Sequence, residues 1–344
     1  MLILGIETSC DDTAIAIYDK HHGILCNYIK KQTIHDKYGG IVPELAARKH
    51  LSNIILLIKK SLLKINKHIK DINGIAYTFG PGLVNSLIIG ATIAHTLAYT
   101  LNIPIIPINH MEGHLLSIML NKNKPVYPFI GLLISGGNTQ LVYAYKFNKY
   151  KIIGNNIDDA VGEVYDKVSK FLKLKVLGGR SIANISKFGI PTQLKFPRPM
   201  LTDKNNLNFS FSGLKTSVKN FIQKNKINTF QMKANIAYAF EDAIRETLFI
   251  KSLRSLQKYN IKQLVIAGGV SSNMNLRKYF YKNFKSYHIK IFFSNMEYCI
   301  DNAAMIAYVG MKKINKYTKY LFWEKIIDPK ITLDDNIKNI IFKN

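Results

Sequence analysis

A pattern that occurs twice limits the folds open to this chain. Residues 2–18 (LILGIETSCDDTAIAIY) and residues 129–145 (FIGLLISGGNTQLVYAY) each contain an apolar run, a short turn of glycine or polar residues and a second apolar run. This order is typical of a β-hairpin. Because helical and strand-like patterns follow each hairpin, we expect an α/β fold built from a duplicated unit, with two lobes and a central cleft between them.

The remaining elements follow from periodicity and from turn residues. After the first hairpin we expect a helix over residues 43–63, a strand over 74–77, a loop at 79–82, a helix through Tyr99 and a strand over 103–108. After the second we expect helices over 159–171, 212–223 and 232–259, a strand over 263–267 and a helix from Asn302 to about Lys316. We expect residues 1–128 to form the N-terminal lobe and residues 129–344 the C-terminal lobe.

The charge favours a polyanionic partner. The 344 residues include 48 Lys and Arg against 22 Asp and Glu, a net charge of +26. Such an excess attracts nucleic acid. Only six of the 48 are arginines, however, and Ile and Asn are frequent, as an AT-rich genome would produce. The charge is therefore explained equally well by RNA attraction and by codon drift.

Several features point to a cytoplasmic protein. Cys10, Cys26 and Cys299 form no CxxC pair, so neither a disulfide framework nor a cysteine-rich zinc site is expected. The N-terminus runs directly into an apolar strand pattern without a basic leader. A long apolar stretch over residues 83–108 is interrupted by a histidine, several threonines and two prolines, which predicts a buried helix followed by a strand and no membrane span.

Three turns that follow apolar runs indicate a nucleotide site. They lie at residues 8–12, 135–139 and 268–273. Backbone N–H groups in such turns can approach phosphate oxygens closely, although one Gly-Gly turn alone is more often a tight loop. None matches GxxxxGK[ST] or GxGxxG, which disfavours a P-loop and a Rossmann site. Three together favour a nucleotide held between the lobes.

The segment His110-Met111-Glu112-Gly113-His114 suggests a metal site. On a helix His110 and His114 would share one face and could both ligate a divalent cation, although solvated or capping histidines give the same spacing. A zinc peptidase needs a glutamate beside the first histidine, whereas Glu112 projects to the opposite side. Asp301 could supply a third ligand, or it could cap the helix that follows it.

Three further segments admit two interpretations each. Asp158, Asp159 and Glu163 suit the positive end of a helix dipole, while the deeper Asp166 could accept hydrogen bonds from a sugar. Gly178 and Gly179 indicate a helix stop or a close approach. The segments 196–200 (FPRPM) and 208–216 (NFSFSGLKT) suit nucleic-acid contact, but a hydrophobic staple explains Phe209 and Phe211 as well.

Taken in order and spacing, these segments resemble one family. The motifs are GIETSCDDT, YGGIVPELAARKH, GPGLVNSL, NHMEGH, LLISGGNTQ, DDAVGEVYDKV, FPRPM, FSFSGLKT, AGGVSSN and the segment around Asp301. They closely resemble the bacterial tRNA N6-adenosine threonylcarbamoyltransferases (TsaD, formerly described as O-sialoglycoprotein endopeptidases) over residues 2–310. The resemblance implies an actin-like, two-lobe ATPase fold. It also implies transfer of threonylcarbamoyl from threonylcarbamoyl-AMP to the adenosine beside the tRNA anticodon, with release of AMP.

The resemblance also implies roles for particular residues. It implies that His110, His114 and Asp301 hold one divalent metal, either iron as Fe²⁺ or zinc. It also implies that Asp11 is a catalytic residue near the reacting atoms. It implies that the adenylate is bound by Leu133, Ile134, Ser135, Gly136, Gly137, Asp166, Gly179 and Asn273. Three positions depart from the family pattern: Asn138 replaces a histidine, Asp12 a glutamate and Arg180 a proline.

Partners follow from the same resemblance. It implies tRNA as substrate, a paralogous inactive partner (TsaB-like), a small ATPase (TsaE-like) and an upstream adenylate-forming enzyme (TsaC-like), with no membrane. The helix over 43–63 or the helix over 232–259 could supply a partner face. The sequence leaves two other functions open: a metal-dependent glycopeptidase, which the position of Glu112 disfavours, and a non-catalytic ATP-binding scaffold.

Overall fold

The computed structural model divides the chain into two compact units. It describes residues 1–344 except 39, 177, 192–193, 226, 318–324, 336 and 338–344. Residues 1–122 and 300–344 form the first unit, and residues 123–299 form the second. Residue 39 of the YGGIVPELAARKH motif therefore lies outside the described residues.

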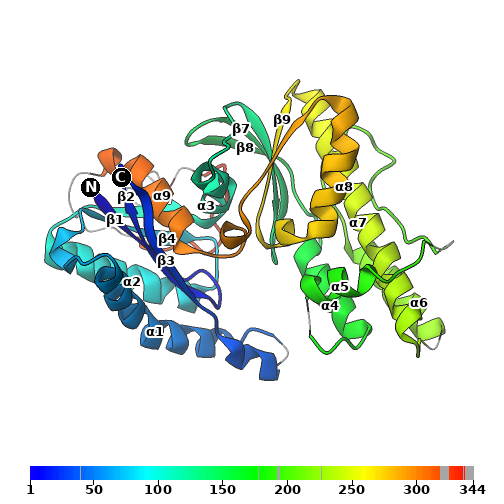
Figure 1. Cartoon of the computed structure of the whole chain (residues 1–344), viewed down its shortest axis with the longest axis horizontal. Helices are drawn as coiled ribbons and strands as arrows, with labels where there is room; N and C mark the ends of the chain where they lie inside the picture. The colour runs from blue at the N-terminus through cyan, green and yellow to red at the C-terminus, as the bar shows by residue number, and fades with distance from the viewer. Residues whose placement is uncertain are drawn as a thin grey trace. The chain divides into compact units, whose positions relative to one another are not determined.

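The first unit is built on a five-stranded mixed sheet (Figure 1). Its strand order is β3 (Gly23–Lys30), β2 (Thr13–Asp19), β1 (Leu2–Glu7), β4 (Gly74–Gly80) and β5 (Ile105–Asn109). The predicted hairpin pairs β1 antiparallel to β2, whereas β4 runs parallel to β1 and β5 parallel to β4. The helices that pack on it are α1 (Pro43–Lys64), α2 (Val84–Leu101) and α9 (Ala303–Lys313).

The second unit repeats this topology. Its strand order is β10 (Lys290–Phe293), β9 (Gln263–Ala267), β6 (Phe129–Ile134), β7 (Thr139–Lys146) and β8 (Lys149–Gly154). If strands β6 to β10 are taken in chain order as the counterparts of β1 to β5, each strand has the corresponding neighbours in both sheets. The hairpin, the parallel strand β9 and the antiparallel edge β8 also agree in direction. The predicted duplicated α/β fold is thus confirmed.

The α-helices described in the second unit are α4 (Val161–Phe171), α5 (Gly179–Ser186), α6 (Ser212–Lys224), α7 (Phe230–Lys258) and α8 (Met274–Phe284). Three of these five, α4, α6 and α7, lie at the predicted positions. Gly179 is the first residue of α5, so the Gly-Gly pair begins a helix and does not end one. Helices α5 and α8 and the edge strands β3, β8 and β10 were not predicted, whereas the edge strand β5 was.

The expected lobe boundary differs from the observed units at the C-terminal end. Residues 300–344 were expected in the second lobe, but α9 packs on β1, β2 and β4 of the first unit. Gly5 makes this packing possible, because a Cβ atom there would lie only 2.5 Å from the carbonyl oxygen of Ala303. Asp301, just before α9, is thereby placed in the first unit.

The apolar segment of the first unit is a core helix. Among the described residues α2 is the one helix long and apolar enough to cross a membrane. Its buried face consists of Ser86, Leu87, Gly90, Ala91, Ala94, His95 and Ala98, at the spacing of one helix face. This face packs on β4 and α1, and β5 follows, as the sequence predicted.

Candidate functional site

The two histidines are presented by a short buried helix, α3 (His110–Leu116). The side chain of Asn109, the last residue of β5, caps α3 by accepting hydrogen bonds from the N–H groups of Met111 (2.9 Å) and Glu112 (3.3 Å). The cap fixes where the helix begins. His110 and His114 then lie on one helix face, with their ring centroids 4.6 Å apart.

Asp301 reaches both histidines from the segment that precedes α9. Its Oδ1 lies 3.0 Å from Nε2 of His114 and 3.5 Å from Nε2 of His110. The neighbouring Asn302 is the N-cap of α9, accepting from the N–H of Met305 at 3.0 Å. The capping alternative for Asp301 is therefore wrong, and its carboxylate is available to a ligand.

These three groups fit a single divalent metal. One ligand atom from each of His110, His114 and Asp301 lies within 4.8 Å of the other two. Both imidazoles are buried, while the Asp301 side chain is 28% exposed. Two imidazoles and a carboxylate form a donor set that suits Fe²⁺ or Zn²⁺ and leaves positions open for a substrate.

The electrostatics of the cluster favour a cation. Burial lowers the pKa of His110, but the carboxylates of Glu7 and Asp301 outweigh this effect and raise it to about 9. Burial raises the pKa of Asp301, but the two histidines lower it to about 2. The carboxylate is therefore ionised at neutral pH, and a positive charge among these groups is stabilised.

Glu7 is a site residue that the sequence analysis missed. It is the last residue of β1 and is fully buried, with Oε2 lying 3.1 Å from Nδ1 of His110. The same oxygen accepts the hydroxyl hydrogen of Thr78, and Oε1 accepts from the N–H of Ser9 at 2.6 Å. Burial opposes the charge, but His110 offsets this effect and the pKa of Glu7 is lowered. A carboxylate ending an otherwise apolar strand was the available sequence signal.

Glu112 lies away from the cluster, as the helix geometry predicted. Its Oε2 is 2.5 Å from Nζ of Lys313 on α9, and both side chains are buried. The carboxylate is therefore engaged by a lysine and does not face the space between the histidines. A zinc-peptidase arrangement is absent from the described residues around His110 and His114.

The turn that carries Asp11 is clamped by α1. Nδ1 of His50 lies 2.8 Å from Oγ1 of Thr13, and Nε2 lies 2.9 Å from the carbonyl oxygen of Cys10. Asp12 in the same turn is half-buried. This burial, with the negative charges of Asp11 and Asp301, raises the pKa of Asp12 to about 6. The turn is thus close enough to Asp301 for their charges to interact.

A separate cavity of about 390 Å³ lies within the second unit. Its walls include four of the eight residues expected to bind the adenylate: Gly136, Asp166, Gly179 and Asn273. Leu133 and Ile134 are buried in β6, and Ser135 and Gly137 belong to the turn that follows. At Gly162 a Cβ would lie 2.4 Å from the carbonyl of Ser135, so only glycine lets α4 pack against this turn.

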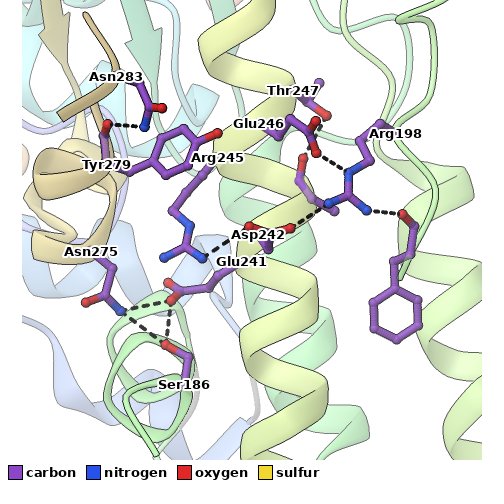
Figure 2. Close-up of polar contacts among 12 residues, drawn as sticks. Ser186, Arg198, Glu241, Asp242, Arg245, Glu246, Thr247, Asn275, Tyr279 and Asn283 are labelled. Atoms are coloured by element: carbon purple, nitrogen blue, oxygen red, sulfur yellow. Dashed lines mark hydrogen bonds and ion pairs between the residues drawn. The ribbon is translucent and has the colours of Figure 1, made fainter. Parts of the chain in front are cut away.

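The side chain of Asn273 is held by the fold. Its Oδ1 caps α8 by accepting from the N–H groups of Asn275 (2.9 Å) and Leu276 (3.3 Å), and its Nδ2 donates to Glu241 at 2.6 Å. Glu241, buried on α7, also accepts from Ser186 (2.5 Å) and from the Asn275 side chain (2.9 Å), as Figure 2 shows. Sequence analysis missed Glu241, which lies inside a helix without a local motif.

Arg198 is a structural residue of the second unit. Its guanidinium donates to Asp242 and Glu246 of α7, each at 2.6 Å, and to the carbonyl of Phe196 at 2.7 Å (Figure 2). Phe209 and Phe211 are fully buried. Ion pairs and core packing thus already engage these side chains, which favours the structural interpretation of both segments.

Two acids that precede α4, Asp158 and Asp159, connect this segment to the start of α6. α4 begins at Val161, so Asp158 and Asp159 precede it. Asp158 accepts from the hydroxyl of Ser210 (2.6 Å) and from the N–H of Phe211 (2.8 Å), and Asp159 pairs with Lys167 and Lys215. These contacts tie the segment to α6, while Glu163 lies in the first turn of α4, where the dipole interpretation expects an acid.

Comparisons with known proteins agree with this geometry. The family model described as "tRNA N6-adenosine threonylcarbamoyltransferase" (TsaD) matches residues 23–308. A protein of that name from Buchnera aphidicola subsp. Baizongia pistaciae (strain Bp) is 49% identical over 339 residues, covering 98% of this chain and 99% of the relative. Another from Wigglesworthia glossinidia brevipalpis is 52% identical over 338 residues, covering 97% and 98%.

Solved structures show the fold. HypF from T. kodakarensis aligns with a TM-score of 0.61 at 14% identity, covering 92% of this chain. The match covers 47% of HypF, so this chain spans about half of that protein's length. The neighbours share the actin-like ATPase fold, which confirms the predicted fold class. With a family model and near-full-length relatives of about half-identical sequence in agreement, the chain belongs to the tRNA N6-adenosine threonylcarbamoyltransferase (TsaD) family.

Proposed function

We propose that this chain transfers the threonylcarbamoyl group from threonylcarbamoyl-AMP to N6 of adenosine 37 in tRNAs that read A-starting codons. The amine nitrogen bonds to the carbamoyl carbon, the bond from that carbon to the phosphate oxygen breaks, and AMP leaves with that oxygen. The amine gives up one proton. The observation that carries this proposal is the convergence of His110, His114 and Asp301 in a chain of the TsaD family.

The cavity of the second unit suits the adenylate. Gly136 and Gly137 have open space where side chains would lie, so their backbone N–H groups can approach a phosphate. Asp166 lines the same cavity, and its carboxylate can accept hydrogen bonds from ribose hydroxyls. Asn273 contributes through a side chain already oriented by Glu241. These residues bind and orient the donor.

His110, His114 and Asp301 would hold the metal, with Fe²⁺ proposed over Zn²⁺. When bound, a divalent cation supplies Lewis-acid polarisation of an oxygen and neutralises developing negative charge. The chain contributes the donor set and the partly exposed side of Asp301, from which a ligand can approach.

Asp11 is proposed as the group that takes the proton from the adenosine amine. An adenine amine is weakly basic, so its proton must leave as the new bond forms. The carboxylate lies in the turn that His50 clamps, which restricts its position. An Asp11→Asn variant that binds adenylate and tRNA but transfers at the wild-type rate contradicts this role.

The helper proteins are proposals of the same kind. We propose a cytoplasmic enzyme that acts on tRNA with a paralogous inactive partner, a small ATPase and an upstream adenylate-forming enzyme.

Of the two helices considered as the face for the paralogous partner, α1 is the better supported, because it exposes Leu51, Ile55, Leu56 and Leu63. An apolar cavity of about 510 Å³ adjoins this face, whereas half of α7 is buried.

The proposed transfer is tested in a strain depleted of its own enzyme. Complementation with this chain should restore N6-threonylcarbamoyladenosine in total tRNA, measured by mass spectrometry of nucleosides. The variant with alanine at positions 110, 114 and 301 should restore none. A triple variant that restores the nucleoside fully would favour a scaffold role for the chain, and chelator-sensitive cleavage of a peptide by purified protein would favour a glycopeptidase.

A further inference from the structure

We propose that Glu7 is a positioning residue that fixes the ring of His110 for metal binding, an inference that rests on the proposed metal site. Glu7 is not one of the three residues that would hold the metal. It acts through its contact with Nδ1 of His110, which leaves Nε2 on the side of Asp301.

The carboxylate of Glu7 is held by three segments of the first unit. Oε1 accepts from the N–H of Ser9 at 2.6 Å in the turn after β1, and Oε2 accepts from the hydroxyl of Thr78 on β4. Oε2 also lies 3.1 Å from Nδ1 of His110 on α3. A fully buried carboxylate with both oxygens engaged cannot rotate freely. It therefore presents a fixed acceptor to His110.

A fixed acceptor determines which nitrogen of the ring can ligate a metal. An ionised carboxylate only accepts hydrogen bonds, so Nδ1 of His110 must carry a hydrogen. In the neutral ring, Nε2 is then the atom with a free lone pair, and Nε2 is the atom that lies 3.5 Å from Asp301. Carboxylates that hold a ligating histidine in this way also raise its basicity.

His114 provides an internal contrast. Its Nε2 faces Asp301 at 3.0 Å, but its Nδ1 is buried without a hydrogen-bond partner among the described residues. His114 is thus oriented by Asp301 and by the neighbouring His110 ring, whereas the ring of His110 is also held at Nδ1 by Glu7. Among the described residues, Glu7 is thus the one carboxylate that contacts the Nδ1 atom of a histidine in the cluster, while Nε2 of that histidine faces Asp301.

The test uses the full chain and Co²⁺ alone as a probe. The Glu7→Gln variant keeps the size of the side chain but puts an NH₂ group in place of an oxygen. An amide nitrogen on the side of His110 donates to Nδ1, which moves the ring hydrogen to Nε2 and blocks that atom as a ligand. We expect Co²⁺ affinity, measured by chelator competition at pH 7.5, to fall 10- to 100-fold. The visible absorption of bound Co²⁺ should also change.

The matched control is Glu112→Gln. It makes the same chemical change at another buried carboxylate, two residues from His110, which pairs with Lys313 and does not face the cluster. Its Co²⁺ affinity should stay within about twofold of wild type. If both variants lose affinity equally, the effect is a general loss of structure and the inference is wrong.

Two further measurements separate the remaining outcomes. If Glu7→Gln does not fold by circular dichroism, Thr78→Val removes one donor to Glu7 and keeps its carboxylate. We expect the Co²⁺ affinity of Thr78→Val to fall by about threefold. A folded Thr78→Val variant with wild-type Co²⁺ affinity overturns the inference. Wild-type affinity in a folded Glu7→Gln variant also overturns it but leaves the proposed function intact. A wild-type chain that binds no Co²⁺ overturns the metal site itself, and the inference with it.

Discussion

Nζ of Lys313 lies 2.5 Å from Oε2 of Glu112, and this buried ion pair joins α3 to α9 in the first unit. The contact has two effects. It directs the acid of the HMEGH segment away from His110 and His114, and it holds α9 against the helix that carries both histidines. The pair therefore contributes to the packing of α9 on α3 and takes no part in the contacts among His110, His114 and Asp301.

Breaking that ion pair should affect stability and leave the chemistry unchanged. Glu112→Gln leaves the Lys313 ammonium buried and unpaired, so the free energy of unfolding should fall by about 3 kcal/mol. The double variant Glu112→Leu with Lys313→Met should recover most of this loss, because neither charge remains. Urea unfolding measures both. A transfer rate in Glu112→Gln more than tenfold below wild type at 25 °C would contradict the structural role.

Removing one ligand should remove the metal. His110→Ala leaves one imidazole and one carboxylate, so bound metal per chain should fall to a small fraction of the wild-type value. The transfer rate should drop at least about 100-fold. Metal content by mass spectrometry after gel filtration measures the first effect. His21→Ala, which changes an exposed histidine, is the control and should keep its metal.

Replacing Glu241 should weaken adenylate binding more than replacing other acidic residues of α7. Glu241→Ala removes the acceptor 2.6 Å from the Asn273 amide and one of the three acceptors of the Asn275 amide, and should cost about 2–4 kcal/mol of unfolding free energy. Adenylate affinity, measured by calorimetry with a non-hydrolysable analogue, should fall at least fivefold. Glu246→Ala on the same helix breaks only the pair with Arg198 and should bind the analogue normally. Equal losses in both variants would show that the effect is not specific.

Asp12 should destabilise the folded chain at neutral pH. Its pKa is raised to about 6 by burial first and then by Asp11 and Asp301, above the ordinary value of 3.8. The folded state therefore holds this proton more tightly than the unfolded state, and stability falls as pH rises from about 4 to about 6. Asp12→Asn should gain about 1–2 kcal/mol at pH 7.5 and nothing below pH 4. Denaturant unfolding at both pH values measures this difference, and a gain that persists at pH 4 would assign it to another cause.

Arg198 should contribute to stability and not to RNA binding. Arg198→Ala removes the guanidinium that pairs with Glu246 and the nearer of the two that pair with Asp242, and the free energy of unfolding should fall by about 2 kcal/mol. The Kd for tRNA, from filter binding at fixed salt, should change less than twofold. Arg48→Ala, which breaks an exposed pair with Glu44, should cost less than about 0.5 kcal/mol. A large loss of tRNA affinity in Arg198→Ala would restore the nucleic-acid interpretation.

Much of the fold could be predicted because its signals are local. The two hairpins and α1, α2, α6 and α7 show themselves as runs with a clear period and with turn residues at their ends. The edge strands β3 and β8 were not named, since half-exposed strands mix polar and apolar side chains without a strong pattern.

The sequence by itself determined the repeated α/β unit, the His-x-x-x-His spacing on one helix face and the glycine turns, because these depend on residues that are neighbours in the chain. Sequence motifs offered Asp301 as a ligand or a helix cap, and tertiary structure decided between them by placing it against His114, 187 residues away. Tertiary structure alone decided that Glu7 supports His110 across 103 residues and that Glu241 orients Asn273. Such contacts depend on how α9, β1 and α7 pack. Local propensity carries no information about packing between segments so far apart in the sequence.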